Sequence, residues 1–363
     1  MIQFLVDLGE KTYPIMIQPS SLKNIGTLIK EHHLGEQAVV ITDQTVMKLY
    51  GNPVRDSLQK AGIQFTFEVV PDGEKSKSLN QASKLYTKLI QFNLHRDGMV
   101  IALGGGVVGD LAGFIAATYL RGVNLIQIPT TLLAQVDSSV GGKVGINHPL
   151  GKNLIGSFYQ PRLVCIDPQV LATLNKREIW AGLGEVIKYG LIWNNLFYTF
   201  MEKNLIAISE LVNWDMISQM IETCCRIKAE VVEKDEKETG LRRILNFGHT
   251  LGHALEAVTD FRYFRHGEAI VHGMHFASYL SLRKAILFKS EFDRIEIMLH
   301  RFQIPKLPKM INDQNLFNKI GIDKKQTKEG LHFVLLETIG QTKVENIPDL
   351  SKQISEWLSY VRK

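Results

Sequence analysis

The feature that most constrains this chain is the alternation, in its first half, of short β-branched runs with segments of helical periodicity. Apolar runs of strand length recur at four places: Ala38 to Thr42, Phe65 to Val70, Met99 to Leu103 and Leu125 to Ile128. Between two of them, Lys77 to Phe92 has apolar spacing close to the helical repeat. Such alternation predicts a parallel sheet covered by helices.

The second half has a different pattern. After about Arg177 the strand signals nearly vanish, and long amphipathic stretches continue to about Phe302, where a linker with Pro305 and Pro308 follows. A chain of 363 residues with 45% hydrophobic content exceeds the size of a single hydrophobic core. We therefore expect two domains, an α/β domain over residues 1–171 and a mainly helical domain over residues 172–363.

A small β-structure is expected near the C-terminus. The segments Leu331 to Leu336 and Gln341 to Val344 flank Gly340, an arrangement typical of a hairpin. The amphipathic stretch Asp349 to Tyr360 predicts a closing helix.

Composition excludes several classes of partner. The net charge is +5, but 42 basic residues are scattered among 37 acidic ones with no basic run interleaved with aromatics, so we expect a small anionic ligand and no nucleic acid. No basic leader precedes an apolar run, and no stretch approaches the roughly 20 apolar residues of a membrane span. Cys165, Cys224 and Cys225 form neither a disulfide framework nor a CxxC pair. A cytoplasmic protein without a membrane partner is expected.

A glycine-rich loop follows the third apolar run. Gly104, Gly106 and Gly109 satisfy G-x-G-x-x-G directly after Leu103, so backbone N–H groups at a helix start suit a pyrophosphate. The loop begins about a hundred residues into the chain, and no acidic residue follows at the usual distance of about 20 residues. These departures indicate a different nucleotide-binding arrangement. The alternative is a tight turn that packs a helix on a strand.

Polar residues follow the other apolar runs. Asp43, the segment Asp72 to Lys77, Thr130 and Thr131 each come directly after one of them. Open α/β sheets bind ligands at the carboxyl ends of their strands, so these residues are candidates to surround a dinucleotide.

Two further glycine-rich segments carry lysines. The stretch Val136 to Lys143 is polar and follows a strand, and Gly151 to Asn153 lies close behind it. Such loops are suited to bringing Lys143 and Lys152 to a phosphate. Ordinary turns with solvated lysines are the alternative.

Histidines and a carboxylate suggest a metal site. His249 and His253 are spaced i and i+4, so a helix would place both imidazoles on one face. His266 precedes another helical stretch, and Glu185 lies three residues before Lys188 on a third.

Glu185, His249 and His266 are the predicted ligands. Three N and O ligands with an open fourth position are typical of catalytic rather than structural zinc. The sequence does not show that the three converge, and each imidazole also fits an ordinary hydrogen-bonded residue. His272 and His275 are expected on a helix surface or in the core.

Seven motifs in order resemble the 3-dehydroquinate synthase family of sugar phosphate cyclases. They are Asp72-Gly-Glu-Lys75, Gly104-Gly-Gly-Val-Val-Gly-Asp110, Pro129-Thr-Thr131, Val136 to Lys143, Gly184-Glu-Val-Ile-Lys188, Leu245-Asn-Phe-Gly-His249 and His266-Gly-Glu268. The resemblance covers nearly the whole chain. It implies an N-terminal Rossmann-like NAD-binding domain, a C-terminal α-helical metal-binding domain, an active site in the cleft, and a homodimer.

The resemblance also implies site residues. The NAD contacts carried over by position are Asp43, Asp72, Gly73, Glu74, Lys75, Ser76, Lys77, Gly105, Gly106, Val107, Val108, Gly109, Asp110, Thr130, Thr131, Lys152, Val170, Leu171, Ala172 and Thr173. The implied metal ligands are again Glu185, His249 and His266, with zinc as the metal and cobalt as the alternative.

Residues with substrate roles are implied in the same way. The catalytic group is Lys143, Lys188, Lys228, Glu238, Arg242, Asn246 and His253. The substrate-binding group is Arg121, Asp137, Asn153 and one of Lys324 and Lys325. Within these groups Lys228 and Arg242 are implied to clamp a carboxylate, and Arg121 to reach in from the other subunit.

The implied reaction converts 3-deoxy-D-arabino-heptulosonate 7-phosphate to 3-dehydroquinate and phosphate, in the shikimate pathway that leads to chorismate and the aromatic amino acids. Transient oxidation by NAD, elimination of phosphate, re-reduction, ring opening and an aldol closure give no net redox change. Another NAD- and metal-dependent sugar phosphate cyclase and a metal-dependent polyol dehydrogenase of similar fold are the alternatives.

Overall fold

A computed structural model describes residues 1–323 and 332–362, and the chain divides into two compact units. The first unit comprises Met1–Leu174 and Leu211–Lys237, and the second comprises Asn175–Glu210 and Glu238–Lys363. Leu174 lies close to the predicted boundary at 171/172. The stretch 211–237 was expected in the second domain, but its helix α7 (Trp214–Lys234) packs mainly on the segment Ala134–Ser138 and also on β1 (Ile2–Val6), both in the first unit.

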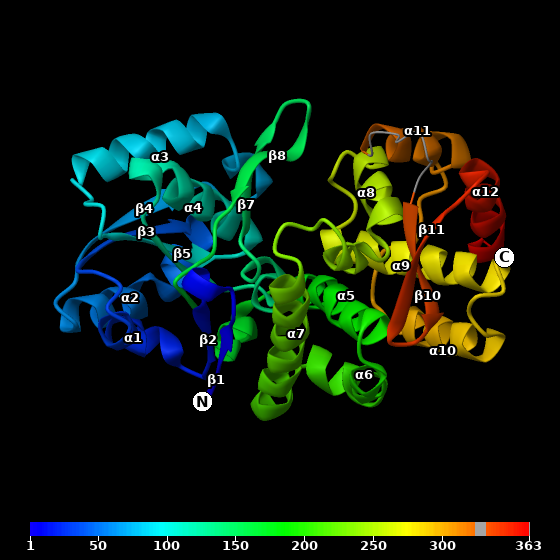
Figure 1. The fold of residues 1–363 in the computed structure, drawn as a ribbon, viewed down its shortest axis with the longest axis horizontal. Coiled ribbons are helices and arrows are strands. Elements are labelled where there is room, and N and C mark those ends of the chain that lie inside the picture. Colours follow the sequence, from blue (N-terminus) through cyan, green and yellow to red (C-terminus); the bar gives the residue numbers. More distant parts are fainter. Residues whose placement is uncertain (324–331, 363) are drawn as a thin grey trace. The chain divides into compact units, whose positions relative to one another are not determined.

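The first unit is built on a seven-stranded sheet with the order β1-β2-β9-β6-β5-β3-β4. Figure 1 labels its strands β1 to β5. All neighbouring strands are parallel except β1 and β2. The strands after β1 are β2 (Tyr13–Ile17), β3 (Gln37–Asp43), β4 (Gln64–Val70), β5 (Met99–Gly104), β6 (Asn124–Pro129) and β9 (Leu163–Ile166). The four predicted runs are β3, β4, β5 and β6, which confirms the parallel α/β architecture.

Helices cover both faces of this sheet. They are α1 (Ile25–Glu31), α2 (Gln44–Lys60), α3 (Leu79–Gln91) and α4 (Gly106–Thr118). In β3, Val40 belongs to the core under α1 and α2, whereas Val39 and Ile41 belong to the core under α3 and α4. Burial on both faces explains the continuous apolar runs in the sequence.

Several strands carry no clear signal in the sequence. β9 has only four residues, β2 contains Pro14, and β1 is an edge strand with alternating exposure. The region expected to be loop after residue 142 forms a separate antiparallel hairpin, with β7 (Lys143–His148) and β8 (Gly151–Phe158) as its strands. Glycines at 142, 145, 151 and 156 make that region resemble a loop.

The second unit is mainly helical, as predicted. Its helices are α5 (Lys176–Ile192), α6 (Asn195–Ser209), α8 (His249–Val258), α9 (His266–Arg283), α10 (Lys289–His300), α11 (Asp313–Asp323) and α12 (Leu350–Val361). Among the described residues, no helix combines the length and apolar character that crossing a bilayer requires.

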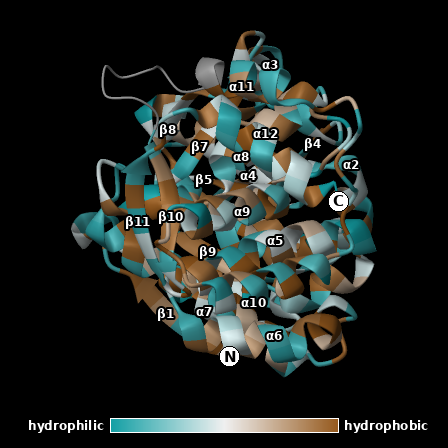
Figure 2. Cartoon of the chain, turned by 90° about the vertical axis from the view of Figure 1, so that its right-hand side faces the viewer, coloured by the Kyte–Doolittle hydropathy of each residue, from teal (hydrophilic) through white to brown (hydrophobic). Residues whose placement is uncertain are grey.

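The predicted C-terminal hairpin is present as β10 (His332–Thr338) and β11 (Gln341–Asn346), and the closing helix as α12. In Figure 2, β10 is mostly in the hydrophobic colour and β11 mostly in the hydrophilic colour. The hairpin therefore buries one strand against the helices and exposes the other.

Candidate metal and nucleotide sites

The glycine loop lies where β5 ends and α4 begins, with Gly104 last in β5 and Gly106 first in α4. A Cβ at Gly104 would come within 2.6 Å of Val108 Cβ, and one at Gly109 within 2.9 Å of Gln127 Oε1. Tight packing of α4 on the sheet thus favours glycine at 104, whereas at 109 the flexible end of Gln127 could move aside. This supports the turn interpretation, and pyrophosphate binding stays a prediction.

The predicted NAD residues after β3 and β4 belong to one hydrogen-bonded group. Asp43 accepts from Val46 N at 2.8 Å and begins α2, while Thr45 Oγ1 donates to Asp72 at 2.6 Å. Burial raises the pKa of Asp43, whereas the hydrogen bond from Thr45 lowers the pKa of Asp72. The structure therefore brings Asp43 and Asp72 to the same edge of the sheet, as expected for adjacent parallel strands.

Lys77 connects this edge to α4 and to the β7–β8 hairpin. Its buried Nζ donates to Asp110 Oδ2 at 2.6 Å and to Asn153 Oδ1 at 2.5 Å. Burial raises the pKa of Asp110, and the charge of Lys77 opposes that shift. A predicted NAD contact, Asp110, and a predicted substrate contact, Asn153, therefore share one ammonium group.

Asn147 was not predicted and lies in the same group. Its backbone N–H donates to Lys77 O at 2.9 Å, its Nδ2 donates to Glu74 Oε1 at 2.8 Å, and its Oδ1 accepts from Asn153 N at 2.9 Å. These bonds attach the hairpin that carries Lys143 to the segment after β4. The asparagine has no distinguishing pattern in the sequence.

The threonines predicted to contact NAD differ in their bonding. The buried hydroxyl of Thr130 has no hydrogen-bond partner among residues 1–323 and 332–362, which fits an absent polar ligand. Thr131 Oγ1 accepts from Ala134 N at 3.2 Å. Thr173 Oγ1 lies 2.6 Å from Tyr50 OH, at the end of the short turn that also holds Val170, Leu171 and Ala172.

Lys228 and Asp137, predicted for the substrate side, form an ion pair inside the first unit. Lys228 Nζ on α7 lies 2.6 Å from Asp137 Oδ1 and 2.7 Å from Asp137 O. Arg242, its predicted partner in the carboxylate clamp, is buried in the second unit. Arg121 is exposed, with the left-handed φ of 68°, and Lys324 and Lys325 lie outside the described residues.

The second unit brings the three predicted metal ligands together. Glu185 Oε1 on α5 lies 3.7 Å from His249 Nε2, at the start of α8, and 3.6 Å from His266 Nε2, at the start of α9. The ring nitrogens of His249, His253 and His266 also approach one another to within 4.8 Å. One carboxylate oxygen and two imidazole nitrogens thus face a common point.

The bonding of Glu185 fits a cation at that point. Its side chain is fully buried, and neither oxygen has a hydrogen bond of acceptable geometry within the described part of the chain. Lys188 Nζ forms an ion pair with Oε2, which leaves Oε1 toward the imidazoles. A buried carboxylate with an uncommitted oxygen beside two imidazoles is the donor set that zinc prefers.

The other nitrogen of each imidazole is also engaged. His249 Nδ1 lies 3.2 Å from Phe247 O, and His266 Nδ1 lies 3.1 Å from Glu256 Oε2. Burial, with the charge of Lys188, holds the pKa of His249 well below its usual value, so its ring is neutral and able to bind metal. Burial acts to lower the pKa of His266, but the hydrogen bond and charge of Glu256 outweigh it and raise that pKa.

Two glycines permit the helices to approach this closely. A Cβ at Gly267 would lie 1.7 Å from Ala181 O on α5, and one at Gly273 would lie 1.9 Å from Gly248 O beside α8. Glu268, the last residue of its motif, is fully buried and accepts from Arg177 at 2.6 and 2.7 Å. This part of the motif therefore holds the start of α9 in place.

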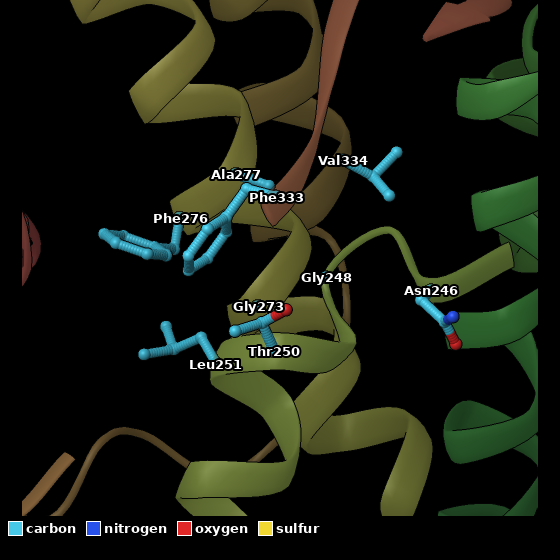
Figure 3. A pocket seen from close by; sticks show the side chains of 9 residues that line it. All are labelled: Asn246, Gly248, Thr250, Leu251, Gly273, Phe276, Ala277, Phe333 and Val334. Atoms are coloured by element: carbon cyan, nitrogen blue, oxygen red, sulfur yellow. The ribbon is translucent and has the colours of Figure 1, made fainter. Parts of the chain in front are cut away.

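Other predicted residues of this unit are Asn246, Glu238 and His253, and of these His253 joins the imidazole cluster. Asn246 Nδ2 donates to Glu238 Oε1 at 2.6 Å, and His253 follows His249 by one turn of α8. Figure 3 shows Asn246 at one side of a narrow hollow that extends to Phe276 and Phe333 and leaves no room for a water molecule. The hollow is a packing gap and not a ligand pocket.

Comparison with known proteins matches two family models that follow each other along the chain. Residues 67–181 match the family described as 3-dehydroquinate synthase N-terminal, and residues 182–326 match 3-dehydroquinate synthase C-terminal. The chain is 50% identical to the 3-dehydroquinate synthase of Desulforamulus reducens over 354 residues, which is 97% of this chain and 96% of that protein. The chain belongs to the 3-dehydroquinate synthase family.

Solved structures of other cyclases share the fold of this 3-dehydroquinate synthase family member. A 2-epi-5-epi-valiolone synthase from Streptomyces hygroscopicus with NAD+ and Zn2+ bound is 25% identical, with a TM-score of 0.89 and 98% of each chain covered. A 2-deoxy-scyllo-inosose synthase complexed with carbaglucose-6-phosphate, NAD+ and Co2+ is 24% identical, with a TM-score of 0.89 and coverage of 98% of this chain and 99% of that one.

Glu256 is a second residue that the sequence prediction missed. It lies on α8, three residues after His253 and seven after His249, so helical spacing places it on the same face. The three-residue spacing was a usable signal. Its contact with His266 depends on the packing of α8 on α9, which the spacing does not specify.

Proposed function

We propose that the chain is a 3-dehydroquinate synthase, which converts 3-deoxy-D-arabino-heptulosonate 7-phosphate to 3-dehydroquinate and phosphate. The observation that carries the chemistry is the buried carboxylate of Glu185, which lacks a hydrogen bond within the described residues and faces two imidazole nitrogens. The choice of substrate is supported by the curated synthase that is 50% identical over nearly the full length.

NAD is the proposed hydride carrier: when bound, it would accept a hydride from the carbon that bears a ring hydroxyl and return it later. The valiolone synthase structure with NAD+ bound supports this cofactor. In the first unit, the start of α4 would receive the pyrophosphate, and the Thr130 hydroxyl would gain the partner that it lacks among the described residues. Asp43 and Asp72, on adjacent strand ends, would bind hydroxyl groups of the dinucleotide.

Glu185, His249 and His266 would hold one divalent ion, zinc first and cobalt as the alternative. The ion supplies Lewis acidity that makes a hydroxyl easier to oxidise and stabilises the ketone that results. The ring of His249 is neutral and Glu185 is a buried carboxylate. Both can bind a metal without an imidazolium first losing its proton. Lys188 balances the charge of Glu185.

Phosphate leaves by elimination once the neighbouring carbon bears an acidic hydrogen. The phosphate itself is the proposed base, and His253 and Asn246 would organise protons and water around it. The hydrogen bond from Asn246 Nδ2 to Glu238 fixes the orientation of the Asn246 amide, including its oxygen. Lys143 and Asn153, on the hairpin of the first unit, are the proposed phosphate ligands of that unit.

Arg242 and Lys228 are the proposed partners of the substrate carboxylate. The guanidinium of Arg242 is buried, which suits a bidentate contact with a carboxylate in a dry site. Lys228 is oriented by Asp137, which holds its ammonium through two contacts.

A cytoplasmic homodimer, in which Arg121 reaches the partner's site, completes the proposal. The exposed Arg121 with its left-handed backbone suits a contact outside its own chain. Light scattering coupled to size exclusion tests the dimer, and a monomer at assay concentration would contradict it.

Product identification tests the proposed reaction. The heptulosonate phosphate is incubated with the protein and catalytic NAD, with and without a chelator, and the carbocycle and phosphate are measured. We expect equal amounts of both products, no accumulation of NADH, and loss of turnover with the chelator. Steady NADH formation from a simple polyol would instead identify a dehydrogenase, and phosphate release only from another sugar phosphate would identify a different cyclase.

A further inference from the structure

We propose that Glu256 is a positioning residue for the metal centre, where it fixes the orientation and tautomer of His266. The inference rests on the proposed metal site and adds a residue outside the predicted ligand set. Glu256 is 7% exposed, and its Oε2 lies 3.1 Å from His266 Nδ1. A carboxylate at Nδ1 accepts the N–H there and leaves the lone pair of Nε2 for a metal.

The two imidazole ligands are oriented by different means. His249 Nδ1 faces the carbonyl of Phe247, only two residues away, so local backbone geometry sets its ring. His266 begins α9, and its Nδ1 partner is a side chain of α8. Because α8 and α9 pack directly on each other, the orientation of the His266 ring depends on how these two helices pack.

A second histidine–carboxylate pair shows what is specific to His266. His275 Nε2 lies 3.2 Å from Glu296 Oε1, but its Nδ1 accepts from Trp357 Nε1 at 2.9 Å. Both nitrogens of His275 are therefore used within the protein. In His266 the second nitrogen, Nε2, faces Glu185 Oε1. The carboxylate of Glu256 therefore orients a ring that still has a nitrogen to offer to a metal.

Zinc affinity separates positioning from a purely structural contact between helices. We would measure zinc binding to the full-length protein by competition with a chromophoric chelator for wild type, Glu256→Ala and Glu256→Gln. We expect Glu256→Ala to bind zinc about 10–100-fold more weakly, because loss of such an outer partner typically has that effect. Glu256→Gln keeps an acceptor but loses the charge, so its affinity should lie between the two.

Glu296→Gln is the matched control, since it alters the equivalent carboxylate at His275 and should leave zinc affinity unchanged. The absorption bands of the cobalt-loaded protein give a second readout, which should change in Glu256→Ala and stay the same in Glu296→Gln. Thermal unfolding of the metal-free proteins identifies variants that fail to fold. If Glu256→Ala does not fold, Glu256→Gln carries the test with the same two readouts.

The outcomes distinguish this inference from the proposed function. A wild-type protein that binds one zinc, together with folded Glu256 variants of unchanged zinc affinity and unchanged cobalt spectrum, overturns the inference and leaves the metal centre standing. A wild-type protein that binds no zinc or cobalt overturns the metal centre, and the inference with it. In the double variant His266→Ala with Glu256→Ala, we expect the same residual affinity as in His266→Ala, because Glu256 acts through His266.

Discussion

The two units neutralise their buried charges in different ways. In the first unit, two lysines at predicted ligand positions are paired with carboxylates, Lys77 with Asp110 and Lys228 with Asp137. In the second unit, Glu185 keeps an oxygen that is aimed at two imidazoles and has no hydrogen bond among the described residues. Each carboxylate has a lysine partner, since Lys188 pairs with Oε2 of Glu185. The first arrangement is complete without a ligand, whereas the second leaves Oε1 and two imidazoles as a donor set for a cation.

The difference shows where a ligand must break an existing ion pair in order to bind. An anionic ligand that approaches Lys77 or Lys228 competes with a carboxylate already in contact, so part of its attraction is lost. A cation that approaches Glu185 displaces no hydrogen bond of that carboxylate. We therefore expect substitutions in the second unit to affect activity most strongly, and substitutions in the first unit to affect stability as well.

The largest effect should come from His266→Ala, which removes one of the nitrogens facing Glu185. We expect loss of bound metal and a fall in kcat/KM of about a thousandfold or more, since Lewis-acid stabilisation is worth several kcal/mol. Metal analysis and a phosphate-release assay measure both quantities. His300→Ala, at an exposed histidine that ends α10, is the control. Full metal content in His266→Ala would show that the ligand set is wrong.

Arg242→Ala should follow, because it removes a buried cation from the proposed carboxylate clamp. We expect a loss of about 2–4 kcal/mol in transition-state stabilisation, measured as kcat/KM. The neighbouring Arg243 is exposed, so Arg243→Ala should leave kcat/KM unchanged. Equal kinetics for wild type and Arg242→Ala would reject the assignment.

Asp110→Asn tests the complete arrangement of the first unit. It keeps an acceptor for Lys77 Nζ but removes the charge, so we expect a loss of about 2 kcal/mol in the free energy of unfolding. Chemical denaturation measures this change. Asp56→Asn, on α2 outside the network, serves as the control. Unchanged stability in Asp110→Asn would mean that the ion pair contributes nothing net and that the contrast between the units is smaller than proposed.

The smallest effect concerns a histidine outside the cluster. Burial lowers the pKa of His272 to about 4, and its Nε2–H donates to Pro305 O at 2.9 Å. The unfolded chain takes up a proton below about pH 6.5 whereas the folded protein does not, so stability decreases as pH falls from about 6.5 toward 4. We expect about 1 kcal/mol of loss between about pH 6.5 and 5.5. His272→Gln keeps a donor and should remove this part of the pH dependence of unfolding; an identical dependence would exclude His272 as its source.

The sequence predicts the elements whose signals are local. The runs that became β3 and β5 are recognisable because burial on both faces requires continuous apolar residues. The helical spacing of α8 likewise placed His249 and His253 on one face. The edge strand β1 and the four-residue β9 give no comparable pattern.

Features that depend on tertiary packing could not be read from the sequence. The membership of α7 in the first unit depends on its contacts with the segment Ala134–Ser138 and with β1, which its amphipathic pattern does not specify. The approach of Glu185 to His266 depends on two helices far apart in the sequence. Asn147 was missed because it is identified only by the partners that it meets in space, whereas for Glu256 the helical spacing was a signal but its contact with His266 was not predictable.

The contacts at Gly267 and Gly273 have a consequence for how this chain can vary. A methyl group at either position would overlap a backbone oxygen, so a library of single substitutions across α9 should lose folded protein at these two sites whatever side chain is introduced. Selection for soluble expression alone, with no assay of turnover, would then retain both glycines. Their intolerance to substitution would come from helix packing. The two glycines would affect the reaction only through the close spacing of the helices that they permit.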